Sequence, residues 1–326
     1  MRPKAQSGYE PGRAASRRPP PLAAGERISI VAPASPFDRE RFDRGVRALG
    51  GLGFDVAVSD GLFARYPAGE GAYLAGDDAH RLAQLRAALA ETKARAIVLA
   101  RGGYGLQRLV HGPGALVAAE LAAQPRLIVG YSDASVLHEL SARAQVPSIH
   151  GPMCTQLGEE PSALARLGAL LRGEKPEPIS WEPLRPAGAR GGRAEGILRG
   201  GNLATLAALC GTELAPRFAG CLVLLEDVNE PPYRFDRFAT QLLQSGAFEG
   251  ARGFVIGDLV GAGEPSAGRA EALAERLGTL GVPVAFGAPF GHAGRNQPVA
   301  FGVPHALDAE AGVLTPLDVP TAERTS

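Results

Sequence analysis

Three side chains in separate parts of the chain could together carry out nucleophilic hydrolysis. Ser132 stands in a tight turn that follows the apolar segment 126–130 and precedes an apolar-periodic helix. A serine hydroxyl is a poor nucleophile at neutral pH, so it needs a base and a group that orients that base. Glu226 ends the apolar segment 222–225, and His292 lies in a glycine-rich loop. These residue types predict a serine hydrolase.

Two glycines could supply the part of such a site that stabilises negative charge. Gly102 and Gly103 follow the apolar segment 96–100, with only Arg101 between. Because glycine has no side chain, its backbone N–H groups can come close to a ligand oxygen, as an oxyanion hole requires.

Each of the three reactive side chains also has a simpler structural interpretation. Ser132 could cap the helix that follows it. Glu226 could pair with Arg234 or Arg237, and His292 could be an ordinary loop residue. The combination favours catalysis, because all three lie at strand ends or in loops, where residues of α/β enzymes converge.

The glycine-rich loops do not match the known nucleotide-binding fingerprints. The dinucleotide pattern that begins at Gly103 has Arg108 at its third glycine position. Neither 102–109 nor 200–206 ends in the Gly-Lys-Ser/Thr of a P-loop. We therefore expect no organic cofactor.

The histidines do not form a recognisable metal motif. His138 is followed by a glutamate on a predicted helix, but a zinc-protease pattern would need histidine where Ala142 stands. We therefore expect no metal. His138 and His150 flank the proposed site, either as structural histidines or as residues of a substrate pocket.

Composition favours an enzyme over a nucleic-acid or membrane protein. The chain has 326 residues, and its 34 basic and 34 acidic side chains cancel, so no overall field attracts nucleic acid or anionic membrane. No apolar stretch is long enough to span a bilayer. The three cysteines are too few and too scattered for a disulfide framework.

Strands alternate with helices along the first half of the chain. Apolar segments at 26–33, 54–58, 96–100 and 127–130 are separated by helical patterns, which predicts a parallel sheet covered on both faces. Ligands of such sheets bind beyond the carboxyl ends of the strands, where Ser132 and the 101–105 loop are expected.

The expected domain organisation has five parts. Residues 1–24 are rich in Arg and Pro and predict a disordered leader, or alternatively a basic tail that contacts a partner. Residues 25–157 form the nucleophile domain, 158–193 a connector that contains the only tryptophan, 194–315 an α/β or α+β domain with the other two reactive residues, and 316–326 a tail.

Several motifs, in order, resemble the LD-carboxypeptidase family of serine peptidases over about residues 26–312. They are Ala-Arg-Gly-Gly-Tyr-Gly at 100–105, Val-Gly-Tyr-Ser-Asp at 129–133, His-Gly-Pro-Met at 150–153, Gly-Gly-Asn-Leu at 200–203, Leu-Glu-Asp-Val-Asn-Glu at 225–230 and Phe-Gly-His at 290–292. The resemblance implies an α/β fold, with an N-terminal Rossmann-like parallel-sheet domain and a second, smaller, β-rich α/β domain at the C-terminus.

The same resemblance implies an activity and roles for individual residues. It implies a cytoplasmic, homodimeric carboxypeptidase that removes the terminal D-alanine from murein tetrapeptide during peptidoglycan recycling. Ser132 would be the nucleophile, His292 the base and Glu226 its orienting carboxylate. Backbone N–H groups of Gly103 and Asp133 would form the oxyanion hole. Glu230, in the same motif as Glu226, is the rival carboxylate, but it enters a Pro-Pro turn rather than ending a strand.

A carboxypeptidase must also hold the terminal carboxylate of its substrate. Arg101, Arg234 and Arg295 are candidates because they adjoin the motifs, and Tyr104 is a candidate for contact with the rest of a peptide. For each arginine, a structural ion pair is an equal alternative.

Two other functions remain open. The related microcin C immunity peptidases cleave amides of aminoacyl adenylate analogues with the same triad, which would call for an aromatic side chain that stacks on a nucleotide. Trp181 could take that part, although packing is the commoner role of a lone tryptophan. A non-catalytic peptide-binding module would instead bind ligand without turnover.

Overall fold

The computed structural model describes residues 10–69, 71–110, 112, 114–261 and 268–323. The chain divides into two compact units, which are described separately. The serine unit comprises residues 15–175, 297–300 and 319–326. The histidine unit comprises residues 1–14, 176–296 and 301–318.

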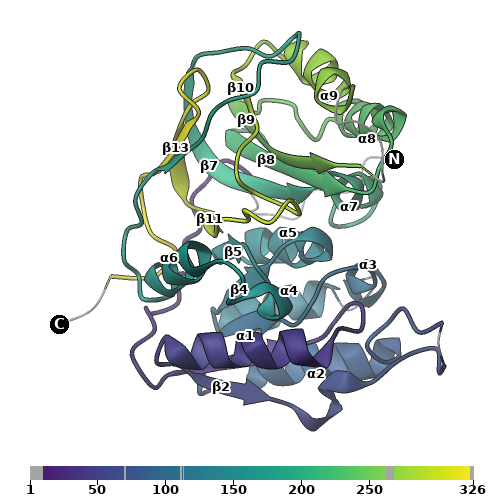
Figure 1. Ribbon diagram of the computed structural model, residues 1–326, viewed down its shortest axis with the longest axis vertical. Helices are drawn as coiled ribbons and strands as arrows, with labels where there is room; N and C mark the ends of the chain where they lie inside the picture. The colour runs from purple at the N-terminus through teal and green to yellow at the C-terminus, as the bar shows by residue number, and fades with distance from the viewer. Residues whose placement is uncertain (1–9, 70, 111, 113, 262–267, 324–326) are drawn as a thin grey trace. The chain divides into compact units, whose positions relative to one another are not determined.

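The serine unit is built on a six-stranded sheet with the order β11-β5-β4-β3-β1-β2 (Figure 1). The strands β2, β1, β3, β4 and β5 pair in parallel, as the alternating pattern predicts. Their order, 2-1-3-4-5, is the flavodoxin-like one rather than the 3-2-1 order of a dinucleotide-binding domain. The strands are β1 Arg27–Val31, β2 Asp55–Val58, β3 Ala94–Leu99, β4 Leu127–Gly130, β5 Ser148–His150 and β11 Val299–Phe301.

The helices of the serine unit begin where the sequence supplies caps. Asp38 accepts a hydrogen bond from the amide of Arg41 at 2.8 Å, and Asp77 accepts one from the amide of His80 at 2.8 Å. The described helices are α1 Arg39–Gly51, α2 Asp78–Ala90, α3 Leu106–Val110, α4 Gly114–Ala123, α5 Ser135–Arg143 and α6 Pro161–Leu171, with short 3-10 turns η1 Asp60–Phe63, η2 Ser132–Ala134 and η3 Cys154–Gln156.

The histidine unit contains a mixed sheet with the order β10-β9-β8-β7-β12-β13-β6. Its strands β7 to β10 pair in parallel, whereas β12, β13 and β6 pair antiparallel. The strands are β6 Ile179–Ser180, β7 Arg193–Asn202, β8 Cys221–Val228, β9 Gly253–Val260, β10 Val284–Phe286, β12 Pro304–Asp308 and β13 Val313–Pro316. This mixture confirms the expected α/β fold class with a β-rich second part.

One hydrophobic core fixes the parallel part of that sheet. Helices α7 Leu203–Ala208, α8 Pro232–Gln244 and α9 Arg269–Gly278 pack with the parallel strands around buried Phe218, Phe235 and Phe254 (Figure 1). A tightly packed core of this kind holds the ends of the strands rigidly. Glu226 lies near the end of β8, one of these strands.

The expectation of a disordered leader is wrong for residues 10–24. Leu22 is fully buried, and its amide donates to the carbonyl of Leu171 at 2.9 Å, while the amide of Arg17 donates to Gln145 at 2.9 Å. The Arg and Pro residues give this segment a composition typical of a disordered chain. The single apolar side chain of Leu22 nevertheless packs into the protein and anchors the segment. Residues 1–9 lie outside the described residues.

The expected connector and tail also contain ordered structure. Residues 158–193 include α6, which is part of the serine unit, and β6, which pairs with β13 in the histidine unit. In the tail, Thr321 is buried and the amide of Ala322 donates to Pro19 at 2.8 Å. Residues 324–326 lie outside the described residues. None of the described helices is long and apolar enough to cross a membrane.

Candidate active site

Ser132 occupies a strained turn at the carboxyl end of β4. Its φ angle is +61°, in the left-handed region that residues other than glycine rarely adopt. Its carbonyl accepts a hydrogen bond from the hydroxyl of Ser135 at 2.7 Å. The side chain is only partly buried. Such strain, kept by the surrounding structure, is a feature of functional sites.

The helix-cap interpretation of Ser132 does not hold. Tyr131 is the N-cap of the short turn η2, and Ala134 is the N-cap of α5. Neither end has a side-chain cap hydrogen bond. Helix capping therefore does not explain the strained backbone of Ser132.

The loop that follows β3 runs beside Ser132. A Cβ atom at Gly102 would lie 3.2 Å from the Cβ of Ser132, so only a glycine leaves this approach unstrained. Gly103 is exposed and has a φ of +101°. Within the described residues, no group accepts a hydrogen bond from its amide. The amide of Gly103 is therefore available to a ligand oxygen, and its part in an oxyanion hole stays a prediction.

Asp133 contributes both a backbone amide and a buried carboxylate to the same region. Its amide belongs to the first turn of η2, where N–H groups have no acceptor within the helix. Its Oδ2 accepts from the amide of Leu106 at 2.9 Å. Burial raises the pKa of Asp133 to about 6, against the opposing effects of that hydrogen bond and the charge of Arg81.

The substrate-binding candidates of the serine unit are exposed. Arg101 donates through Nη1 to the carbonyl of Pro36 at 2.6 Å. Tyr104 is 49% exposed, and its ring centroid lies 6.2 Å from that of Tyr73. Neither side chain is committed to the core, so both can reach a ligand.

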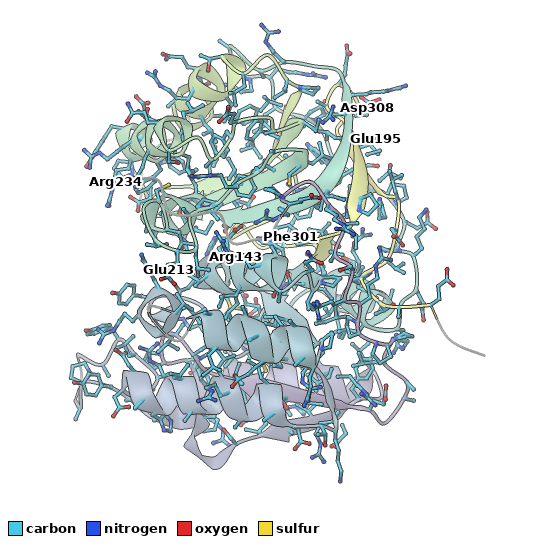
Figure 2. All side chains as sticks on the ribbon, turned by 180° about the vertical axis from the view of Figure 1, so that it is seen from behind. Arg143, Glu195, Glu213, Arg234, Phe301 and Asp308 are labelled. Carbon is cyan, nitrogen blue, oxygen red and sulfur yellow. The ribbon has the colours of Figure 1, made fainter. Side chains whose placement is uncertain are left out.

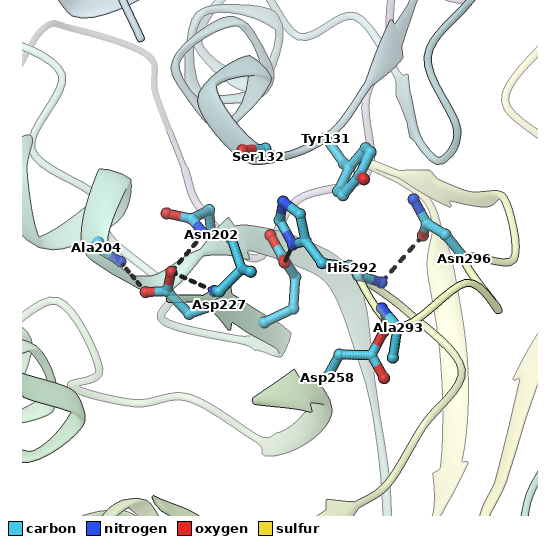
Figure 3. Close-up of polar contacts among 12 residues, drawn as sticks. Tyr131, Ser132, Asn202, Ala204, Asp227, Asp258, His292, Ala293 and Asn296 are labelled. Carbon is cyan, nitrogen blue, oxygen red and sulfur yellow. Dashed lines mark hydrogen bonds and ion pairs between the residues drawn. The ribbon is translucent and has the colours of Figure 1, made fainter. Parts of the chain in front are cut away.

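The histidine unit brings Glu226 and His292 together. The Nδ1 atom of His292 lies 2.8 Å from Oε2 of Glu226, whose side chain is fully buried (Figure 3). Because a carboxylate only accepts hydrogen bonds, Nδ1 carries the proton and Nε2 is the nitrogen that can accept one in the neutral ring. Glu226 thus sets the tautomer that a general base requires.

Two local features of the backbone produce this contact. The pairing of β8 with β9 shifts register between Leu225 and Asp227, because β9 has one residue more over this stretch. Glu226 therefore lies opposite a bulge in β9, and such an irregularity can re-aim nearby side chains. Gly291, with a φ of +119°, lies so close that a Cβ there would be 3.1 Å from Oε2 of Glu226. Because Gly291 has no side chain, it leaves space for the carboxylate of Glu226.

Polar side chains hold the backbone on both sides of His292. Asn296 Oδ1 accepts from the amide of Gly291 at 3.2 Å, and Asp258 Oδ2 accepts from the amide of Ala293 at 2.7 Å (Figure 3). The two amides that flank His292 are thus both bound by side chains.

Asp227 ties the end of β8 to helix α7. Its carboxylate accepts from Asn202 Nδ2 at 2.9 Å, from its neighbour Val228 at 2.8 Å and from the amide of Ala204 at 2.9 Å (Figure 3). Burial and then the charge of Glu226 raise the pKa of Asp227 to about 7, against these hydrogen bonds.

The carboxylates around His292 make it a stronger base. Burial by itself lowers the pKa of His292, but the hydrogen bond to Glu226 and the charges of Glu226, Asp227 and Asp258 outweigh it and raise the pKa above its ordinary value. The imidazolium that forms during proton transfer is therefore stabilised.

Glu230, Arg234 and Trp181 make contacts that do not involve His292. Glu230, which precedes α8, pairs at 2.9 Å with Arg234 in the first turn of that helix, and Arg234 lies at the surface (Figure 2). Arg234 is therefore engaged in a structural ion pair, whereas Arg295 is exposed. Trp181 is buried, and its Nε1 donates to Phe286 at 2.9 Å, which makes it a packing residue.

The histidines of the serine unit differ from His292. His138 is buried between the hydroxyl of Ser148, at 2.8 Å, and the carbonyl of Gly130, at 2.9 Å, and burial lowers its pKa to about 4. It is a structural histidine that fixes strand β4 behind Ser132.

Among the described residues, no group of three or more His, Cys, Asp or Glu side chains could hold a metal ion.

Sequence reasoning missed two polar residues that bind the amides beside His292, Asp258 and Asn296, and the contact of Asn202 with Asp227. A usable signal existed for Asp258, because it follows the apolar segment 253–257 as Glu226 follows 222–225. Nothing in the pattern marks Asn202 as a partner of Asp227, or Asn296 as a partner of the Gly291 amide.

Models of one peptidase family match both halves of the chain. The LD-carboxypeptidase N-terminal domain matches residues 28–151, and the LD-carboxypeptidase C-terminal domain matches residues 195–307. The chain belongs to the LD-carboxypeptidase family. This LD-carboxypeptidase is accordingly a serine-type carboxypeptidase, in agreement with the motifs around Ser132.

Named relatives cover almost the whole LD-carboxypeptidase chain. A Streptomyces coelicolor protein is 41% identical to this chain, over 93% of this chain's length and 96% of its own length. Its name as a carboxypeptidase is provisional. The murein tetrapeptide carboxypeptidase of Pseudomonas aeruginosa is 32% identical, over 86% of this chain and 93% of its own. The microcin C7 self-immunity protein MccF of Escherichia coli is 26% identical, over 88% of this chain and 92% of its own length.

A solved structure supports the same fold. The crystal structure of muramoyltetrapeptide carboxypeptidase from Oxalobacter formigenes matches with a TM-score of 0.72 and 26% identity, covering 88% of this chain and 97% of that one.

Proposed function

We propose that this LD-carboxypeptidase releases the terminal D-alanine of murein tetrapeptide, with Ser132, His292 and Glu226 as its catalytic triad. The observation that carries the proposal is the 2.8 Å hydrogen bond between buried Glu226 and Nδ1 of His292. It prepares Nε2 as a general base, and the strained Ser132 turn presents a hydroxyl for that base. The activity further requires Nε2 to come within hydrogen-bond reach of Ser132 Oγ.

The reaction would proceed through an acyl-enzyme. His292 takes the proton of Ser132 as the hydroxyl oxygen attacks the carbonyl of the scissile amide. The amides of Gly103 and Asp133 donate to the resulting oxyanion, and the imidazolium then gives its proton to the leaving amine of D-alanine. Water, deprotonated by the same histidine, hydrolyses the ester and restores Ser132.

The substrate assignment rests on the relatives and on exposed polar groups. The P. aeruginosa relative is named for murein tetrapeptide. Exposed Arg101 and Arg295 are the proposed anchors for the terminal carboxylate, because a guanidinium can bind it through two hydrogen bonds. Tyr104 is proposed to contact the remaining peptide.

Hydrolysis of aminoacyl nucleotide amides is the alternative that the MccF relative suggests. Burial of Trp181, whose Nε1 is bonded to Phe286, removes the aromatic side chain considered for stacking on a nucleotide. A non-catalytic binding module is disfavoured by the His292–Glu226 pair, since peptide binding alone has no need of an oriented base.

A cytoplasmic location and a homodimeric state belong to the same proposal. Recycled murein peptides are cytoplasmic in the pathway that the family resemblance implies, so the enzyme must meet them there. Sedimentation of the purified protein at several concentrations and fractionation of cells test these two points.

The decisive experiment compares substrates and variants. The protein is incubated with murein tripeptide, tetrapeptide and pentapeptide and with an aspartyl sulfamoyl adenosine, and the products are identified by mass. We expect D-alanine from the tetrapeptide alone. Ser132→Ala should lower that turnover by about 10⁴-fold or more, while Ser162→Ala, at an exposed serine of the same unit, should retain it.

Two other outcomes would assign a different function. Cleavage of the adenosine compound alone would assign the MccF-type activity. Binding of tetrapeptide without turnover in the wild-type protein, unchanged by Ser132→Ala, would support the binding module.

A further inference from the structure

The loop between β3 and α3 is held at several of its peptide groups by contacts from other parts of the serine unit. The amide of Ser35 donates to the carbonyl of Gly102 at 3.1 Å, and the hydroxyl of Ser35 accepts from the amide of Tyr104 at 3.1 Å. Ser35 therefore binds the backbone on both sides of Gly103.

The end of the same loop is fixed by two further groups. Asp133 Oδ2 accepts from the amide of Leu106 at 2.9 Å, and Nη1 of Arg81 donates to the carbonyl of Gly105 at 3.0 Å. Arg81 is fully buried and also donates to the carbonyls of Pro33 and Gly76. The amide of Gly103 remains as the exposed donor in the middle of this bound loop.

Ser35 also packs directly beneath Gly103. A Cβ at Gly103 would overlap the hydroxyl of Ser35, and the φ of +101° is one that only glycine adopts without strain. Gly103 therefore leaves space for Ser35, and Ser35 in turn binds the peptide groups on both sides of Gly103.

We propose that the side chains of Ser35 and Asp133 are positioning residues that aim the Gly103 amide at the oxyanion. The proposal rests on the proposed serine hydrolysis and extends it to residues that do not touch substrate. A glycine pair has many accessible backbone conformations, so without these bonds the peptide would sample orientations in which its N–H points away.

Asp133 gives the arrangement a second purpose. It follows Ser132 in the chain, and its carboxylate binds Leu106 at the far end of the loop. The nucleophile turn and the oxyanion loop are thereby joined, so that the distance between Ser132 and the Gly103 amide is kept. Catalytic groups must be held within about 0.5 Å of their productive positions for full effect.

The first test is Ser35→Ala, which removes the acceptor for the Tyr104 amide. Loss of one oxyanion donor typically lowers turnover about 10²- to 10³-fold, and loosening one should cost about tenfold. We expect kcat for tetrapeptide to fall about tenfold, with KM within about twofold and an unchanged melting temperature. Ser29→Ala, at another buried serine of the same unit on β1, is the matched control.

The second test compares Asp133→Ala with Asp133→Asn. The asparagine keeps a carbonyl oxygen that can accept from Leu106, whereas alanine does not. We expect Asn to retain most of the activity and Ala to lose at least tenfold. Equal losses in both variants, or none in either, would contradict a positioning role.

A fluorophosphonate probe makes the test independent of the peptide substrate. Its attack by Ser132 also places a negatively charged oxygen in the oxyanion hole, so the labelling rate should fall in Ser35→Ala as kcat does. If the wild-type protein releases no D-alanine but is labelled at Ser132, the substrate assignment fails and the labelling rates still decide the role of Ser35. A labelling rate that Ser35→Ala leaves unchanged overturns the inference, as does a wild-type protein that is not labelled at Ser132.

Discussion

The serine unit and the histidine unit build their parts of the proposed site by different means. In the serine unit, Ser132 lies against the backbone of Gly102, and the carboxylate of its neighbour Asp133 accepts from an amide and feels the charge of the buried Arg81. In the histidine unit, three carboxylates, those of Glu226, Asp227 and Asp258, act on the single imidazole of His292.

This difference follows from what each half must do. The serine half has to place a neutral hydroxyl and N–H donors, for which conformation and close packing matter most. The histidine half has to stabilise a positive charge, for which fixed negative charge matters most. We therefore expect the histidine half to respond strongly to changes of charge and the serine half to changes of shape.

The largest effect is expected from Glu226→Gln. The substitution keeps the size of the side chain but removes the charge that holds Nδ1 of His292 protonated and stabilises imidazolium. Turnover should fall by about 10³- to 10⁴-fold, as is typical when the orienting carboxylate of a triad becomes an amide. Release of D-alanine under saturating substrate measures it.

Glu230→Gln provides the matched comparison. Glu230 lies four residues along the chain and pairs with the half-exposed Arg234 rather than with the histidine. A pair of this kind near the surface contributes little, so activity should stay within about threefold of wild type. The reverse result, an active Glu226→Gln and an inactive Glu230→Gln, would transfer the orienting role to Glu230.

A smaller effect is expected from Gly291→Ala, which tests whether shape also limits the histidine half. A Cβ there would lie 3.1 Å from the Cβ and Oε2 of Glu226 and from the Cβ of Asp258. Displacement of the carboxylate or the histidine by a fraction of an ångström should lower kcat by up to about 10²-fold.

Gly294→Ala separates that crowding from backbone strain. Gly294 also has a positive φ, of +88°, but a Cβ there would meet nothing within 4 Å. It should therefore cost about 1 kcal/mol of stability and little activity. If both alanine variants lose kcat equally, strain in the loop and not crowding of Glu226 sets the activity.

The sequence predicts the scaffold of the site better than its supporting contacts. Alternating strands and helices predict the parallel sheet, and a serine after an apolar strand predicts the turn, because both depend on local pattern. The bulge of β9 opposite Glu226 depends on how β8 pairs with β9, and neither strand alone reveals that register.

The sequence pattern also does not show which individual residues are buried. Leu22 is fully buried although its neighbours are typical of a disordered leader. Ser35 is buried beneath Gly103, and in the sequence it is one polar residue in a Pro-rich turn. These contacts join segments distant in the chain, so only the folded structure brings them together.

The smallest effect, and the most specific for charge, is expected from Asp258→Asn. The negative charge of Asp258 helps to raise the pKa of His292, whereas its hydrogen bond to Ala293 can be kept by the carbonyl oxygen of asparagine. The pKa of His292 should therefore fall towards its ordinary value.

The pH dependence of kcat/KM reports this change directly. His292 must be neutral to accept the proton of Ser132, so wild-type activity is lost as pH falls through the raised pKa of the free enzyme's histidine. In Asp258→Asn the acidic limb should move to lower pH by a few tenths of a unit to about one unit, with a plateau within a few-fold of wild type. Glu249→Gln, which removes an exposed charge from the same unit, should leave the limb in place. A limb that stays unchanged in Asp258→Asn, or moves to higher pH, would show that the carboxylates around His292 act through structure and not through charge.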